Sequence, residues 1–339
     1  MKEGLGLQEL ATRVKEQSLA IMDFKAPTEQ LRFNGELELQ VNGHGTYRVS
    51  EWAHGQIAET FDIPAKFYNR LMEKHPDVLS QTVNALFERE PKVRMVRTLA
   101  PPVDVYSGNG STNPAELSRG VVRAFVSDRY HRRDNIDLLN ASLPALQLNN
   151  LDIRSMQVTD KKLYLKATSQ LEGEVRKGDP IRLGVAISNS EIGAGATAIE
   201  PFIERLVCLN GAVLTEWTQR KAHLGRQLEG GGDVELLLSD EALAAGDVAF
   251  WLAFRDLMSG LLTAEFFDKV LTQARQAAER MLTNLSDVPR VVEMVAQGYG
   301  LQEAERTSVL DRLIAGNDFS QWGLANAITA ASQTIVSYD

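Results

Sequence analysis

The densest group of side chains that could bind a ligand lies between Arg123 and Arg133. Four arginines, one tyrosine and one histidine occur there with a single acidic residue, Asp128. Guanidinium groups neutralise phosphates, and a neighbouring tyrosine or histidine ring can stack on a base, as in proteins that bind single strands. We therefore expect nucleic-acid contacts from Arg123, Arg129, Tyr130, His131, Arg132 and Arg133. The alternative is an exposed charged turn in which Tyr130 fills part of the core.

Further candidate contacts lie before and after this group. Arg94 and Arg97 occur on the strand expected beside Arg123, and their odd spacing places them on opposite faces of it. A small basic cluster runs from Lys221 to Arg226. The set of expected nucleic-acid contacts is completed by Arg94, Arg97, Asn189, Arg205, Lys221, His223 and Arg226.

The glycine-containing stretch 188–195 joins an expected strand to a helix expected over Ala196–Leu209. The N–H groups at a helix N-terminus can receive an anion, and the glycines permit close approach. No Gly-Lys-Ser/Thr sequence follows, however, and Glu191 would repel a phosphate. A turn held by side-chain hydrogen bonds of Asn189 or Ser190 is the alternative.

The sequence gives little support to catalytic or metal chemistry. Cys208 would need a base such as His131 or His223 to act as a nucleophile, and a buried, inert thiol is the commoner situation. The five histidines form no His-x-x-x-His pair, and no pair among the 45 acidic residues is singled out for acid–base work. We therefore assign no catalytic residue, no metal ligand and no cofactor.

The composition is that of a globular protein of about two domains. Its 339 residues are 44% hydrophobic and 24% charged, which is ordinary for a folded chain. No run approaches the roughly 18 apolar residues of a membrane helix, and charged residues interrupt the N-terminal stretch where a signal peptide would lie. A single cysteine excludes an internal disulfide framework. We expect a cytoplasmic protein with no membrane partner.

Charge is distributed unevenly along the chain, whose net charge is −9. Residues 1–91 carry 10 Lys and Arg against 14 Asp and Glu, residues 92–226 carry 19 against 14, and residues 227–339 carry 7 against 17. A basic middle beside an acidic C-terminal third is typical of an interaction surface. A solvated surface of mixed charge is the alternative.

The periodicity of hydrophobic residues predicts an α+β fold. An N-terminal helix, a hairpin around Asn42-Gly43 and further helices precede strands over residues 92–99 and 120–127. The elements expected next are a helix over Asn135–Leu148, three strands of a meander over 151–158, 163–168 and 181–188, and the helix over Ala196–Leu209.

Three regions follow from these elements. An N-terminal hairpin and helical region is expected over residues 1–91, and a central antiparallel sheet with packed helices over 92–228. Gly230-Gly231-Gly232 marks a linker to a mostly helical region over 233–339. Because the helical pattern runs to Asp339, we leave open an extension of the native chain beyond it.

Seven short stretches, in order, carry a resemblance to a known family. They are Ile63–Tyr68, Val83-Asn84, Arg123–Tyr130, Asn189–Gly193, Arg205–Gly211, His223–Gly225 and Trp322–Ala327. Together they resemble the phage/plasmid-like protein family, a domain of unknown function on mobile elements. The resemblance implies a setting of replication, recombination or defence. More remotely, the expected fold is similar to that of single-strand annealing recombinases, which form oligomeric rings with DNA in a basic groove.

Three functions remain open at this stage. The basic middle favours a single-stranded nucleic-acid-binding protein of a phage or plasmid, a homo-oligomer that anneals or recombines single-stranded DNA. The second is an enzyme that acts on nucleotides or nucleic acid, with the 189–195 turn and His131 or His223 as its site. The third is an oligomeric structural protein of a mobile element or defence system, docking through its acidic C-terminal third. The first is our working hypothesis, although the acidic net charge counts against strong DNA binding.

Overall fold

Strands from both sides of residue 92 form the first sheet. In the computed structural model, which describes residues 6–100, 120–206, 210–213, 219–221, 240–282, 288–299 and 301–332, the strand order is β1-β5-β6-β4-β3-β2. Neighbouring strands are antiparallel except β4 and β6, which are parallel. The strands are β1 (Ile21–Pro27), β2 (Leu31–Phe33), β3 (Leu39–Val41), β4 (Gly45–Val49), β5 (Val93–Leu99) and β6 (Val121–Ser127). The boundary expected between residues 91 and 92 falls inside this sheet.

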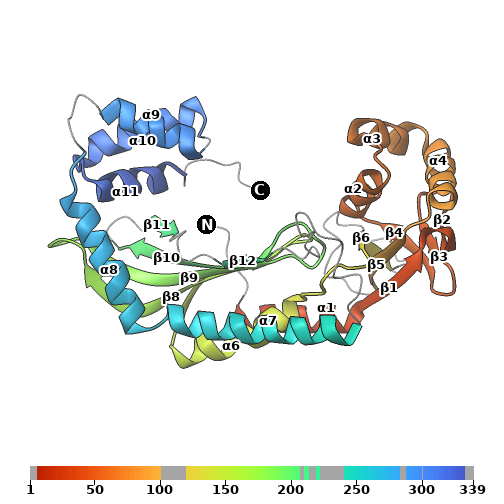
Figure 1. Cartoon of the computed structure of the whole chain (residues 1–339), viewed down its shortest axis with the longest axis horizontal. Helices are drawn as coiled ribbons and strands as arrows, with labels where there is room; N and C mark the ends of the chain where they lie inside the picture. Colours follow the sequence, from red (N-terminus) through yellow and green to blue (C-terminus); the bar gives the residue numbers. More distant parts are fainter. Residues whose placement is uncertain are drawn as a thin grey trace.

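Helices cover one face of the first sheet. They are α2 (Glu51–Thr60), α3 (Ala65–Lys74) and α4 (Pro76–Arg89), with a 3₁₀ turn, η1 (Thr28–Gln30), after β1. The Ser50 hydroxyl caps α2 by accepting a hydrogen bond from the Ala53 N–H, and α4 begins with Pro76. Phe87 of α4 and Phe125 of β6 belong to one buried core. These helices and the β3–β4 hairpin agree with the sequence-based expectation (Figure 1).

The second sheet is antiparallel. Its order is β11-β10-β9-β8-β7, and β12 also pairs with β10. The strands are β7 (Asp152–Val158), β8 (Leu163–Glu174), β9 (Pro180–Asn189), β10 (Thr197–Arg205), β11 (Asn210–Val213) and β12 (Gln219–Lys221). The expected meander is therefore present as β7, β8 and β9.

The helix expected over Ala196–Leu209 was wrong, because Thr197–Arg205 form β10, while residues 207–209 lie outside the described ranges. Ile199 and Ile203 face buried cores on one side of the strand, while the Phe202 ring lies over Gly184 on the other. A strand with apolar residues on both faces can imitate helical spacing. Pro201 was the contrary signal, because proline in a helix interior removes a hydrogen bond and clashes with the preceding turn.

One face of the second sheet packs against helices. The opposite face, which we call the open face because no described helix crosses its middle in Figure 1, still buries Thr168 and Phe202. Below the sheet in Figure 1 lie α1 (Leu7–Ala20), α6 (Asn135–Leu148) and α7 (Asp240–Leu261). Leu138 of α6, Phe254 of α7, and Leu163 and Leu165 of β8 share one core. Because side chains alternate along a strand, Tyr164 lies on the face turned away from these helices.

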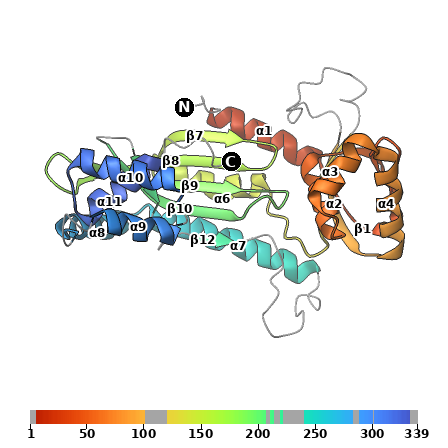
Figure 2. The ribbon, with the colours of Figure 1, turned by 90° about the horizontal axis from the view of Figure 1, so that it is seen from above.

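The C-terminal helices lie at one end of the second sheet. They are α8 (Ala264–Glu279), α9 (Val288–Tyr299), α10 (Glu303–Gly316) and α11 (Gln321–Ser332). Helix α8 shares a core with strands of the second sheet. Val292, Leu313 and Leu324 lie in the core between the last three. Helices α9 to α11 and helices α2 to α4 rise at opposite ends of the molecule, on the side of the open sheet face (Figures 1 and 2).

This arrangement confirms the α+β class, with an N-terminal hairpin and helices, a central antiparallel sheet and a mostly helical C-terminal part. Over the ranges described, no helix combines the length and the apolar character needed to cross a bilayer. The Gly230–Gly232 linker and Asp339 lie outside those ranges.

Candidate functional site

The expected basic cluster divides into a buried layer and an outer layer. Arg97, Arg123, Arg133 and Tyr130 are buried, with Arg97 fully enclosed. Arg132, by contrast, has 53% of its side chain exposed. The cluster therefore does not present all of its guanidinium groups to a ligand on one surface.

Carboxylates enclose Arg97 at the junction of the two sheets. Its Nε donates to Asp23 Oδ1 at 3.1 Å, its Nη2 to Asp134 Oδ1 at 2.6 Å and its Nη1 to the Glu191 carbonyl at 2.6 Å. Burial disfavours the charge, but the carboxylates of Asp134 and Asp23 outweigh it and raise the pKa of Arg97. Arg97 is thus held inside the protein and does not reach a phosphate from there.

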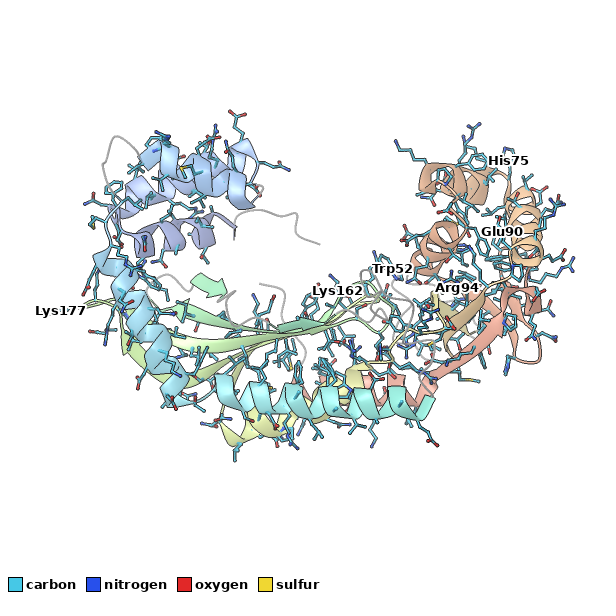
Figure 3. The ribbon with its side chains drawn as sticks, in the orientation of Figure 1. Trp52, His75, Glu90, Arg94, Lys162 and Lys177 are labelled. Carbon is cyan, nitrogen blue, oxygen red and sulfur yellow. The ribbon has the colours of Figure 1, made fainter. Side chains whose placement is uncertain are left out.

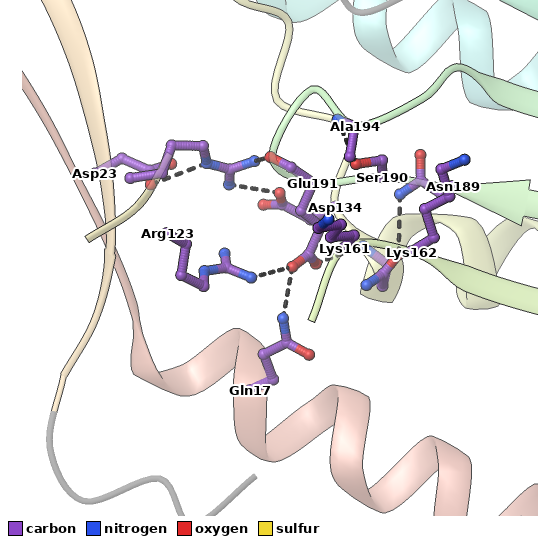
Figure 4. A network of polar contacts seen from close by, with 12 residues as sticks. Gln17, Asp23, Arg123, Asp134, Lys161, Lys162, Asn189, Ser190, Glu191 and Ala194 are labelled. Atoms are coloured by element: carbon purple, nitrogen blue, oxygen red, sulfur yellow. Dashed lines mark hydrogen bonds and ion pairs between the residues drawn. The ribbon is translucent and has the colours of Figure 1, made fainter. Parts of the chain in front are cut away.

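Arg123 has a similar internal role (Figure 4). Its Nη1 donates to Glu191 Oε2 at 2.6 Å, and Gln17 of α1 donates to the same oxygen at 2.6 Å. The other oxygen of Glu191 accepts from the Asn135 N–H at 2.8 Å. Glu191 therefore connects β6, α1 and the start of α6, and its carboxylate is directed into the protein.

The 188–195 stretch is a tight connection between β9 and β10, so the anion site expected at a helix N-terminus is not formed here. Asn189 Nδ2 donates to the Arg133 carbonyl at 2.8 Å, and its Oδ1 accepts from the Thr197 hydroxyl at 2.7 Å. The alternative of a turn held by side-chain hydrogen bonds describes this stretch correctly.

The outer layer of the cluster lines a cavity of about 420 Å³ between β1, residues 128–132 and α7. Its lining includes Lys25, Arg129, His131 and Arg132 together with Asp128 and Asp247. His131 Nδ1 lies 3.0 Å from Asp247 Oδ1 of α7. The Arg133 guanidinium lies over the Phe250 ring at 4.3 Å, also on α7. Part of the cluster is therefore engaged by the C-terminal half of the chain.

The remaining expected contacts are dispersed. Arg94 is partly buried on β5, where burial lowers its pKa and Asp128 opposes that effect. Arg205, at the end of β10, pairs with Asp179. Lys221 pairs through its backbone with Thr197 at the edge of the second sheet. His223, Arg226 and Cys208 lie outside the described residues.

A second group of basic and aromatic side chains lies on the open face of the second sheet, at the end near α2 (Figure 3). The Lys161 ammonium lies 5.2 Å from the centroid of the Trp52 ring, and the Lys162 ammonium 5.9 Å from that of Tyr164. Tyr164 is 42% exposed, and Lys166 follows it on the same face of β8. We call Trp52, Lys161, Lys162, Tyr164 and Lys166 the platform.

The 188–195 connection positions the platform. The Ile192 carbonyl accepts hydrogen bonds from Trp52 Nε1 at 2.9 Å and from Gln56 Nε2 at 2.8 Å. A Cβ atom on Gly195 would lie 2.9 Å from Lys162 Cε, so the glycine lets the lysine stem pack closely. The orientation of the Trp52 ring is therefore fixed by a turn that the sequence had singled out for another reason.

Ion pairing divides the open sheet face into two parts. Toward the C-terminal helices, Arg154 pairs with Glu204 at 3.3 Å and Arg182 pairs with Glu172. Among the residues that the structure describes, no carboxylate lies within ion-pair distance of the ammonium groups of Lys161, Lys162 or Lys166. The ammonium groups of Lys161, Lys162 and Lys166 therefore make no close ion pair within the described ranges, although the Asp160 carboxylate interacts with Lys161, and Glu51 and Glu59 lie beside Lys161.

A cavity of about 380 Å³ adjoins the platform on its α2 side. Its lining consists of Glu51, Trp52, Gly55, Gln56, Glu59 and Lys161. Both polar atoms of the Gln56 amide make hydrogen bonds inside the protein, because its Oε1 accepts from the Phe125 N–H at 2.8 Å. The cavity thus offers an aromatic wall, an ammonium group and two exposed carboxylates.

The sequence analysis missed the platform, although the sequence pattern of its strand residues was visible. The alternation in the expected strand 163–168 places Tyr164 and Lys166 at outward positions, just after Lys161-Lys162. Trp52 lies more than a hundred residues earlier, and only the contact of α2 with the 188–195 connection brings it there.

The described histidines and acids give no comparable catalytic or metal arrangement. His54 is buried against the Tyr68 hydroxyl at 2.8 Å, and burial lowers its pKa to about 4. No group of three or more His, Cys, Asp or Glu side chains is placed to hold a metal ion in the described part of the chain.

Comparison with models of protein families, with curated proteins and with solved structures finds no match to this chain.

Proposed function

We propose that this protein binds single-stranded nucleic acid, with single-stranded DNA as its partner, across the platform. Trp52 and Tyr164 would stack on bases, and Lys161, Lys162 and Lys166 would neutralise phosphates. Stacking on an aromatic side chain contributes about 1–3 kcal/mol per base and tolerates any sequence. A duplex keeps its bases stacked on each other, so the aromatic rings select single strands.

The observation that carries this proposal is the division of the open sheet face by ion pairing. Arginines at the far end of the sheet are already paired with glutamates, whereas the three lysines of the platform are not. Phosphate binding at the platform therefore breaks no internal ion pair. In a chain of net charge −9, attraction of a polyanion would then depend on these three ammonium groups and not on the charge of the whole molecule.

The arginine cluster between Arg123 and Arg133, which the sequence analysis expected to bind nucleic acid, has a structural role in this proposal. Arg97 and Arg123 hold the frame that carries the platform, because their partner Glu191 is in the same connection as Ile192. Arg129 and Arg132 line a separate cavity beside β1 and α7, and the proposal gives them no direct part in stacking.

The biological setting in this proposal is a phage or plasmid protein that anneals or recombines single-stranded DNA in the cytoplasm as a homo-oligomer. The resemblance of seven sequence stretches to the phage/plasmid-like family supports it. Native mass spectrometry and particle imaging, with and without a single-stranded oligonucleotide, test the assembly directly.

The first prediction concerns the salt dependence of binding. The variant carrying Lys161→Gln, Lys162→Gln and Lys166→Gln should bind an oligothymidylate more weakly and respond less to salt. For single strands the slope of log affinity against log salt is about −0.7 per phosphate neutralised, so loss of three contacts flattens it by about 2. Fluorescence anisotropy between low and moderate salt measures this slope.

Lys177→Gln is the matched control. Lys177 is exposed at the far end of the second sheet, away from the platform (Figure 3), so its removal should leave the slope unchanged. The proposal fails if the triple variant keeps the slope of the unmodified protein, or if the unmodified protein binds no oligonucleotide.

A further inference from the structure

The two glutamates beside Trp52 are not explained by phosphate binding. Glu51 and Glu59 are exposed and line the cavity next to the platform, where carboxylates repel a phosphodiester chain. We propose that this cavity receives a single base of the bound strand and prefers guanine, which the carboxylates recognise by its N–H donors. The inference rests on the proposed function and adds a base preference to it.

The spacing of the lining residues gives the cavity its shape. Glu51, Gly55 and Glu59 are four residues apart on α2 and therefore lie in one row along the helix, each about 6 Å from the next. Trp52 and Gln56 form the neighbouring row. A base stacked on Trp52 would thus place its edge over Gly55, with a carboxylate one helical turn to either side.

Gly55 keeps the space over this row open. A Cβ atom built there meets no atom within 4 Å, so packing inside the protein does not require glycine at this position. Glycine inside a helix costs about 1 kcal/mol relative to alanine. The free space above Gly55 leaves room for the edge of a base to approach the helix between the two carboxylates.

Apart from the Lys161 ammonium, which also lines the cavity, the neighbouring polar groups are engaged inside the protein and leave recognition to the glutamates. Trp52 Nε1 and Gln56 Nε2 both donate to the Ile192 carbonyl, and Gln56 Oε1 accepts from Phe125. Ionised carboxylates act only as hydrogen-bond acceptors, so they favour a base edge that consists of donors.

Guanine fits this requirement better than the other bases. Its N1–H and N2–H₂ groups are adjacent donors that one carboxylate can accept together. Adenine and cytosine present an amino group beside an acceptor nitrogen, and thymine presents one N–H between two carbonyls. The phosphates of the same strand would lie over Lys162 and Lys166, while Lys161 lines the cavity beside the Trp52 ring.

The test uses 15-residue oligothymidylates that carry one central guanine, hypoxanthine, adenine or cytosine. A bidentate contact to one base is worth about tenfold in discrimination. We expect the guanine oligonucleotide to bind about tenfold more tightly than oligothymidylate, and the hypoxanthine one, which lacks the N2 amino group, to fall between them. Glu51→Gln with Glu59→Gln should remove this preference without weakening the binding of oligothymidylate.

Gly55→Ala provides a variant that does not rely on damage to the fold. The added methyl group should raise the melting temperature, because alanine favours the helix, yet it should reduce the preference for guanine. Gly260→Ala, in an open position of α7 remote from the cavity, should affect the melting temperature only.

The outcomes separate this inference from the proposed function. Equal binding of all five oligonucleotides, or a guanine preference that survives both the glutamate and the glycine substitutions, overturns the base preference and leaves single-strand binding intact. Absence of binding to every oligonucleotide overturns both.

Discussion

Burial decides what each charged side chain of this protein can do. Arg97 is fully enclosed and surrounded by Asp23, Asp134 and Glu191, so its charge stabilises the fold and is not available to a ligand. Lys166 is exposed on a strand without a neighbouring carboxylate within ion-pair distance in the described ranges. The residue type alone pointed to the arginines, because they are dense in the sequence. Which cations were internally paired became visible only when distant carboxylates were placed beside them.

His54 illustrates the same effect for a neutral group. In the folded protein burial lowers its pKa to about 4, whereas an exposed histidine titrates near 6.5. As the pH falls from 7 to 5 the unfolded chain therefore takes up the proton first, and the free energy of unfolding should decrease by about 2 kcal/mol. Urea denaturation at the two pH values measures this change.

His54→Gln is the comparison for this measurement, because glutamine keeps a polar partner for Tyr68. The variant should lose the part of the pH dependence that belongs to His54. An identical decrease in both proteins would show that other groups are responsible.

At the scale of elements, local patterns predicted most strands and helices but not how they combine. Apolar and polar residues alternate along strand 163–168, and apolar residues recur along helix 135–148. Both elements were therefore predicted with the correct type. The segment 197–205 was mistaken because it buries apolar residues on both faces. The parallel pairing of β4 with β6 joins residues more than seventy positions apart, and no local turn sequence predicts such a contact.

The Arg97 network joins elements of the two sheets, so its loss should lower the free energy of unfolding of the whole protein. Arg97→Met would leave the carboxylates of Asp23 and Asp134 without their main partner at the junction. Removal of one partner from a buried ion pair typically costs about 3–5 kcal/mol. Arg255→Met removes an exposed pair with Asp256 and should cost about 1 kcal/mol or less. Chemical denaturation of both variants provides the comparison, and equal small losses would contradict a structural role for the network.

At the scale of the whole molecule, the two helical ends rise on the side of the open sheet face, and Trp52 and Lys162 of the platform lie near α2 (Figures 1 and 3). The acidic C-terminal third, with 7 Lys and Arg against 17 Asp and Glu in residues 227–339, repels polyanions elsewhere on the surface. If the protein binds a single strand as proposed, we expect that strand to be confined to the platform. Confinement of this kind favours specific placement over general affinity for nucleic acid.

The aromatic and the basic parts of the platform should then have separable effects on binding. Trp52→Ala and Tyr164→Ala should each weaken the binding of a single strand by about 1–3 kcal/mol, because each removes one stacking surface. Neither removes a positive charge, so the salt slope should stay that of the unmodified protein, in contrast to the lysine variants.

Trp52→Phe retains a ring and should recover much of the affinity. Anisotropy titrations at three salt concentrations, with duplex DNA as the reference, distinguish the two effects. Plots of log affinity against log salt that are parallel to that of the unmodified protein but lower support stacking. A changed slope, or an equal loss of affinity for duplex DNA, would mean that the rings only hold the lysines in place.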